Sequence, residues 1–128
     1  MLVFLSATLY GFALTQPALN SGDQAYTGWD CLRSGLLDMV AWYANPLLLF
    51  AWILILCRNW LGAPLAACSL TAAISFTGLT PSRGDLGELR LGYWLWMASI
   101  SVALVAGLAV AIASVVEESR RTRETRTV

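Results

Sequence analysis

The chain has 128 residues, of which 58% are hydrophobic and 12% are charged. Soluble domains carry about 25% charged residues, so this composition excludes an ordinary water-soluble fold. Equal numbers of basic and acidic residues give a net charge of zero, and no nucleic-acid partner is expected. The length fits one membrane domain, residues 1–128, with three or four spanning helices of about 20 residues each.

The first apolar run, Met1 to Leu14, allows two interpretations. Its length is close to that of the apolar region of a signal peptide, but no basic residues precede it. Extended to Gln16 as a helix, the run reaches about 24 Å, which is enough for a thin bilayer. We therefore predict a first span over residues 1–16.

A polar segment follows, from Thr15 to Ser34, and is the longest expected loop. It is rich in Pro, Asn, Gly and Asp, the residues typical of turns exposed to water. Tyr26 and Trp29 lie where the chain returns to the membrane, and we favour anchoring at the bilayer interface for both. The alternative is that this loop is a recognition surface.

The second predicted span covers residues 36–57 and is interrupted by Asn45-Pro46. Proline lacks an N–H group and disfavours helical geometry in the residue before it, so the helix must kink or restart there. The part after Pro46 is about 18 Å long, too short to cross a bilayer alone. We expect a kinked span whose freed backbone groups are satisfied by Asn45 or by a neighbouring helix.

Two polar residues of this span, Asp38 and Asn45, are candidate functional residues. A carboxylate inside a span is costly and by default indicates function. Asp38 lies close to the outer end of the span, however, so we favour pairing with Arg33 or Arg90 at the headgroup level. Asn45 either caps the helix that restarts after it, which we favour, or reaches across to another span.

The third and fourth spans are predicted over residues 61–79 and 91–116, and a short turn at Arg58 joins the second span to the third. Each carries small residues at spacings of three or four, which place them on one helical face. Such faces permit close backbone approach, so these residues are candidates for helix packing and partner binding. They are Gly62, Ala66, Ser69 and Ala73 in the third span and Ser99, Ala103, Gly107 and Ala111 in the fourth.

Aromatic residues near the expected span ends are predicted to anchor the protein at the bilayer interfaces. They are Trp29, Trp60, Tyr93, Trp94 and Trp96.

Arginines predict the orientation. Arg58 and the four arginines of the tail, residues 117–128, fall on one side, which the positive-inside rule makes cytoplasmic. Both termini are then cytoplasmic, and the two acid-containing loops are outside. The basic residues are all arginine and alanine is abundant, which we interpret as the codon bias of a GC-rich bacterial genome. The expected location is therefore the bacterial inner membrane.

No catalytic or metal site is expected. The chain contains no histidine, and its cysteines, Cys31, Cys57 and Cys68, lack metal-ligand spacing, so we expect neither a metal nor a cofactor. The sequence has no nucleophile beside a base and no phosphate-binding glycine loop. Its clearest carboxylates all lie in expected loops: Asp23, Asp30, Asp85 and Glu88. We therefore expect no enzyme activity.

Three short motifs give a resemblance that covers most of the chain: Gly28-Trp29-Asp30, Ala44-Asn45-Pro46 and Gly92-Tyr93-Trp94-Leu95-Trp96. In these motifs the chain resembles a group of small uncharacterised bacterial four-helix membrane proteins. That resemblance implies a fold but no activity and no functional residues. In size and in its lack of catalytic residues, the chain is also similar in architecture to membrane immunity proteins that protect bacteria from pore-forming toxins.

The expected fold is an all-α polytopic integral membrane protein, a four-transmembrane-helix bundle with a proline-kinked second helix. The expected function is non-enzymatic: binding another membrane protein, either as an accessory subunit of a membrane complex or as an immunity-type protein. Binding would use the small-residue faces and the two outer loops. The alternative is a small homo-oligomeric channel or transporter in which Asp38 lines the path.

Overall fold

The computed structural model describes residues 1–21, 24–34, 40–79 and 90–126, most of which are helical. The helices are α1 (Leu2–Thr15), α2 (Gly28–Ser34), the 3-10 helix η1 (Val40–Tyr43), α3 (Ala44–Leu56), α4 (Gly62–Leu79) and α5 (Leu91–Arg126). Two antiparallel strands, β1 (Pro17–Ser21) and β2 (Gln24–Thr27), form a hairpin between α1 and α2. The fold is all-α with one small hairpin, and the segment expected to be an irregular loop contains regular elements.

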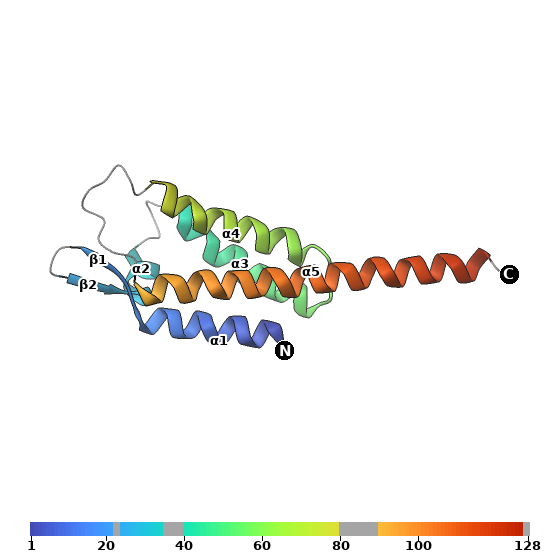
Figure 1. Cartoon of the computed structure of the whole chain (residues 1–128), viewed down its shortest axis with the longest axis horizontal. Helices are drawn as coiled ribbons and strands as arrows, with labels where there is room; N and C mark the ends of the chain where they lie inside the picture. Colours follow the sequence, from blue (N-terminus) through green and yellow to red (C-terminus); the bar gives the residue numbers. More distant parts are fainter. Residues whose placement is uncertain (22–23, 35–39, 80–89, 127–128) are drawn as a thin grey trace.

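Helix α5 packs against α1 and α4, and α3 packs against α4 (Figure 1). Successive long helices run in alternating directions, so the N-terminus and the α3–α4 turn lie at one end of this helix bundle. The hairpin and α2 lie at the other end, and we call β1, β2 and α2 the hairpin cap. Helix α5 continues for several turns beyond the end of the bundle that holds the N-terminus.

Small side chains allow the helices to approach closely. The buried core cluster consists of Ala44, Leu48, Ala73, Ile100 and Ala103. A Cβ atom added at Gly107 would lie 2.8 Å from the Cα atom of Ala63, well inside van der Waals contact. Helix α5 therefore meets the start of α4 backbone to backbone, at a position that only glycine fits.

The second predicted span differs from the observed helix. A 3-10 turn, η1, leads directly into α3, so Pro46 is the third residue of the α-helix. In the first turn of a helix the backbone N–H groups have no intrahelical partner, so proline costs little there. The helix restarts at Ala44 ahead of the proline, while Asp38 lies outside the described residues.

Among the described residues, one helical stretch is long and apolar enough to cross a membrane: Leu91–Arg123 of α5. The other apolar stretches, Leu2–Thr15, Ala41–Leu56 and Gly62–Ser75, are shorter. The 14 residues of α1 reach about 21 Å at 1.5 Å per residue, against a hydrocarbon core of about 30 Å. Length and composition thus support one spanning helix, and the other three predicted spans need separate evidence.

The glycine contacts predict a matched pair of variants. Gly107→Ala should lower the free energy of unfolding by about 1–3 kcal/mol, because the new methyl group overlaps the backbone of Ala63. Gly11→Ala is the control, because a Cβ atom there meets nothing within 4 Å and alanine favours a helix. Thermal unfolding in mild detergent should separate the two, and equal melting temperatures would contradict the close α4–α5 contact.

Candidate functional site

Ser6 of α1 and Ser99 of α5 exchange hydrogen bonds in the core. The Ser6 hydroxyl donates to the Ser99 carbonyl oxygen at 2.8 Å, and the Ser99 hydroxyl donates to the Ser6 carbonyl oxygen at 2.9 Å. The indole Nε1 of Trp52, from α3, donates to Ser6 Oγ at 2.9 Å. Both serines are fully buried. Three helices therefore meet at one set of satisfied hydrogen bonds.

Asn45 makes the second level of this arrangement, about one helical turn away. Its Oδ1 accepts from the Tyr10 hydroxyl at 3.1 Å and from the Trp96 indole Nε1 at 3.0 Å, so α1, α3 and α5 meet here again. The Tyr10 ring also contacts the Trp52 ring edge to face, with centroids 5.7 Å apart. We call this set the polar network: Ser6 and Ser99, which are fully buried, and Tyr10, Asn45, Trp52 and Trp96, which are half-buried.

The amide nitrogen of Asn45 donates to the backbone carbonyl of Trp42, in the turn that precedes α3. In an α-helix the carbonyl of Trp42 would accept from the N–H of residue 46, but Pro46 has no N–H. Asn45 Nδ2 donates to that carbonyl oxygen at 3.2 Å instead. The favoured role of Asn45 as a helix cap is not observed, because α3 begins at Ala44 with Tyr43 at the cap position and has no side-chain cap bond; Asn45 instead reaches two other helices, the alternative left open above.

The chemistry of this network is structural. The partners of the serine hydroxyls are carbonyl oxygens, another hydroxyl and an indole N–H, none of which is a base that could activate a nucleophile. In the described part of the chain, no group of three or more His, Cys, Asp or Glu side chains could hold a metal ion. The network therefore holds helices in register and orientation.

The eight small residues proposed for packing and partner binding lie within the chain's own helix bundle. Seven of them are buried, and Ala111 is half-buried. The Ser69 hydroxyl, for example, donates to the Ala44 carbonyl oxygen at 2.7 Å and joins α4 to α3. In this arrangement the two faces are occupied by neighbouring helices of the same chain and are not available for contact with another molecule.

The five proposed interfacial anchors separate into two groups. Trp29, Trp60 and Trp94 are exposed, with 58–59% of each residue accessible. Tyr93 is buried, and Trp96 is turned inward to donate to Asn45. Residues 93 and 96 share one face of α5, because they are three apart, whereas residue 94 points away from that face.

The hairpin cap is fixed to the bundle by backbone contacts. The N–H of Gly28 donates to the Gln16 carbonyl oxygen at 3.0 Å, and a Cβ atom on Gly28 would clash with the carbonyl of Ala13. The N–H of Arg90 donates to the Ala18 carbonyl oxygen at 3.0 Å. Glycine at position 28 therefore allows α2 to begin directly against the end of α1.

Thr27 and Asp30 form a capping box at the start of α2. Asp30 Oδ2 accepts from the Thr27 hydroxyl at 2.6 Å and from the Thr27 backbone N–H at 3.0 Å. The backbone N–H of Asp30 in turn donates to Thr27 Oγ1 at 3.2 Å. The Gly28-Trp29-Asp30 motif thus has a local explanation, in which glycine packs against α1, the acid caps α2, and the tryptophan between them is exposed.

Sequence reasoning missed three members of the network: Ser6, Tyr10 and Trp52. One signal was available for Trp52, which lies in the middle of an expected span and not at its end. A buried tryptophan usually finds a partner for its N–H. Ser6 had no comparable signal, because a hydroxyl in an apolar helix can bond its own backbone.

Comparisons with models of protein families, with curated proteins and with solved structures find no match.

The serine pair predicts a stability difference. Ser6→Ala should lower the free energy of unfolding by about 1–2 kcal/mol, because the Trp52 indole N–H loses its acceptor and the Ser99 carbonyl oxygen loses the hydroxyl that donates to it. Ser101→Ala is the matched control, since this exposed hydroxyl bonds only the Met97 carbonyl of its own helix. Unfolding in detergent measures the free energy of unfolding of both variants. An equal decrease in the two would contradict the stabilising role of the buried serine pair.

The capping box predicts a pH dependence confined to the hairpin cap. The hydrogen bonds from Thr27 hold the pKa of the Asp30 carboxyl below its usual range. Stabilisation by the ionised carboxyl is therefore complete above the unfolded value near 4 and is lost as the pH falls through the lowered folded value. Hydrogen exchange of residues 28–32, corrected for intrinsic rates, should accelerate over that acidic range.

In the Asp30→Asn variant this acceleration should disappear, because the amide does not titrate. Exchange in α5 between residues 96 and 106 serves as the internal reference. A wild-type protein whose α2 exchange does not change relative to that reference would contradict the capping role.

Proposed function

We propose that the chain is a multi-pass protein of the bacterial inner membrane, in which α1, α3 with its preceding segment, α4 and α5 all cross the bilayer. The observation that carries this proposal is the distribution of polarity. The hydrogen-bonding side chains of the polar network lie between the helices, while their outward faces carry large apolar residues. This is the reverse of a soluble helical bundle, whose outward faces are charged or polar.

The outward apolar residues come from every long helix. They include Phe4, Leu5 and Phe12 of α1, Leu49, Phe50 and Ile53 of α3, Ile74 of α4, and Val105, Leu108 and Ile112 of α5. Soluble monomers rarely expose contiguous apolar patches beyond a few hundred Å². Lipid is the solvent that accounts for the outward faces of α1, α3 and α4 and for the part of α5 that no second helix covers.

The positions of the first charged residues along α5 and in the α3–α4 turn support the same proposal. Arg58, in the α3–α4 turn, lines an open groove together with Glu117 of α5, so the first charges on both elements lie at one level. The 26 residues of α5 that precede Glu117, residues 91–116, reach about 39 Å, which crosses a hydrocarbon core of about 30 Å and extends into the headgroup region. The shorter helices α1 and α3 require a locally thin bilayer.

We further propose that the protein is not an enzyme and acts by binding another membrane protein, as an accessory subunit or an immunity-type protein. The small-residue faces are occupied internally, which leaves the hairpin cap as the preferred contact surface. The cap presents Trp29 and Tyr26 on a base held by backbone hydrogen bonds. Exposed aromatic residues on a pre-organised support are typical of binding hot spots.

The topology is tested with two native cysteines. Cys31, in the hairpin cap, should react in intact cells with a maleimide that does not cross the membrane, whereas exposed Cys57 should react only after the cells are opened. Burial raises the pKa of the Cys31 thiol, so its labelling should be slow at neutral pH and faster near pH 8.5. Protection of Cys31 together with labelling of Cys57 in intact cells would contradict the orientation.

The partner surface is tested by purification from native membranes in mild detergent. Trp29→Ala should reduce the recovery of a co-purifying membrane protein by about tenfold or more, as expected for a hot-spot residue. Trp60→Ala is the matched control, because Trp60 is equally exposed but lies at the opposite end of the bundle. Equal recovery with both variants would contradict the hairpin cap as the partner-binding surface.

The alternative, a homo-oligomeric channel or transporter, rests on Asp38, which lies outside the described residues. An intramembrane carboxylate is the observation that favours it. Ion flux into vesicles containing the purified protein, lost in the Asp38→Asn variant, would support conduction over partner binding.

A further inference from the structure

One apolar stripe on α5 faces away from the helix bundle. Val105, Leu108, Ile112 and Val115 follow one another at spacings of three, four and three, and each exposes 48–67% of its surface. The opposite face of α5, which includes Ala103 and Gly107, is buried against α1, α3 and α4. Spacings that alternate between three and four are those of a coiled-coil seam.

The stripe continues past the end of the bundle. Arg58 of the α3–α4 turn and Ser114 of α5 line the same groove, so the turn lies beside α5 at this level. Every described side chain of α5 beyond Ser114 is exposed. Figure 1 shows this part of α5 extending beyond the other helices. An isolated helix of about 12 residues is marginal in water, so this extension gains most from a second helix that packs along it.

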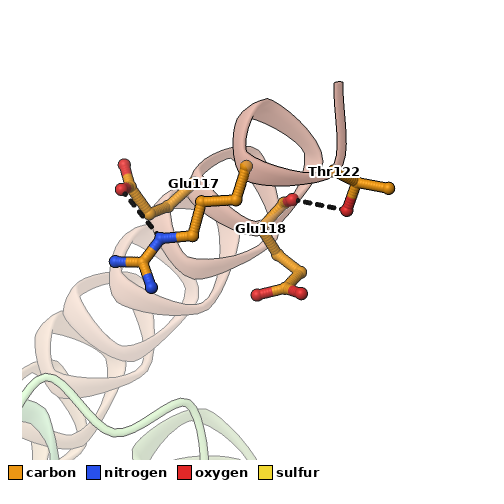
Figure 2. Close-up of polar contacts among 4 residues, drawn as sticks. Glu117, Glu118 and Thr122 are labelled. Atoms are coloured by element: carbon orange, nitrogen blue, oxygen red, sulfur yellow. Dashed lines mark hydrogen bonds and ion pairs between the residues drawn. The ribbon is translucent and has the colours of Figure 1, made fainter. Parts of the chain in front are cut away.

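The next two seam positions are Ser119 and Thr122, which are small and already satisfied. The Ser119 hydroxyl donates to the Val115 carbonyl oxygen at 2.8 Å, and the Thr122 hydroxyl donates to the Glu118 carbonyl oxygen at 2.9 Å (Figure 2). Side chains that bond their own backbone can enter a helix interface without leaving a buried donor unsatisfied. The seam therefore extends from Val105 to Thr122.

The charges that flank the seam are complementary in one arrangement. Glu118 directly precedes a seam residue and Arg123 directly follows one, which are the g and e positions of a heptad. In a parallel pair of α5 helices, Glu118 of each copy lies opposite Arg123 of the other. In an antiparallel pair g positions face g positions and e positions face e positions, so Glu118 would not lie opposite Arg123.

An ion pair within α5, between Glu117 and Arg121, lies off the seam. Arg121 Nε and Glu117 Oε1 are 3.4 Å apart, four residues along the same helix (Figure 2). These two residues occupy the outer c and f positions, where they stabilise each helix without contacting a partner. The pattern thus assigns intrahelical pairing to one side of α5 and intermolecular pairing to the other.

We infer that α5 pairs with α5 of a second copy of this chain, as a parallel two-stranded coiled coil along the seam Val105, Leu108, Ile112, Val115, Ser119 and Thr122. This goes beyond the proposed function, which leaves the oligomeric state open. The parallel direction rests on the proposed membrane insertion, which orients all copies alike, as well as on the charge pattern. A homodimer would present two hairpin caps on the same side of the membrane.

Cysteine cross-linking in native membranes tests the seam. In a background carrying Cys31→Ser, Cys57→Ser and Cys68→Ser, single cysteines at seam positions 112, 115 and 119 should each form a homodimeric disulfide. The off-seam variants Ala113→Cys and Ser114→Cys are the controls and should cross-link at least about fivefold less, since these positions point away from the seam. Equal cross-linking on and off the seam, or cross-linking at only one seam position, would overturn the parallel pair.

Charge reversal tests the same pair without cysteines at the seam. Glu118→Arg and Arg123→Glu should each reduce dimer formation by about three- to tenfold at low salt, because each places like charges opposite each other twice. The double variant should restore the dimer. Glu117→Arg with Arg121→Glu is the control and should leave it unchanged, and single reversals with no effect would contradict the arrangement.

Alkaline carbonate extraction of the same membranes separates this inference from the proposed function. Protein that resists extraction but gives no seam cross-link contradicts the dimer alone. Protein that is extracted while the seam cross-link persists contradicts the membrane proposal and leaves the pairing of α5 supported.

Discussion

The reciprocal hydrogen bonds between Ser6 and Ser99 are the constraint on which the rest of the bundle depends. In a chain whose helices are apolar on all sides, contact between apolar side chains hardly distinguishes one rotation of a helix from another, least of all in lipid. A buried hydroxyl is different, because leaving it unsatisfied costs about 1–3 kcal/mol. The two serines therefore fix both the rotation and the register of α1 against α5, and Trp52 adds α3 to the same point.

The Asn45-Pro46 pair extends this control to the start of α3. Proline removes one backbone donor, which leaves the Trp42 carbonyl to be satisfied by another group, and the neighbouring amide nitrogen satisfies it. That bond holds the Asn45 side chain in place, so its oxygen remains available to accept from Tyr10 and Trp96. The hydrogen bond from Asn45 to the turn that precedes α3 thus positions its side chain to bind two others.

The sequence predicted those parts of the fold that depend on spacing along one helix. The third span was expected at residues 61–79 and α4 covers Gly62–Leu79, while the fourth was expected to begin at residue 91, where α5 begins. The faces of small residues were equally visible, because spacings of three and four define a face without knowledge of its neighbour. Asn45 was identified as a polar residue of interest, although the capping role favoured for it is not observed.

Features that depend on contacts between distant segments were not predictable in the same way. The turn residues of the segment 15–34 are compatible with an irregular loop and with a hairpin, and contacts with other segments, such as the close approach of Gly28 to Ala13 and the Arg90–Ala18 backbone hydrogen bond, favour the ordered form. The role of Ser6 depends on Ser99, 93 residues away. Helix α5 continues past the predicted end of the fourth span, residue 116, to Arg126, with an ion pair and side-chain hydrogen bonds along its own surface.

These observations divide the surface of the molecule by function. The faces richest in small residues, which are the most suitable for intimate helix contact, are used within the chain, so they stabilise one copy and contribute nothing to recognition. The outward surface consists of three parts: the exposed apolar faces of the long helices, which we call the apolar belt, the hairpin cap at one end and the projecting part of α5 at the other. The belt lacks the directional groups that distinguish one partner from another. In the proposed binding role, specificity would come from the two ends, where exposed aromatic side chains lie on a base held by backbone hydrogen bonds and charged residues occupy heptad positions.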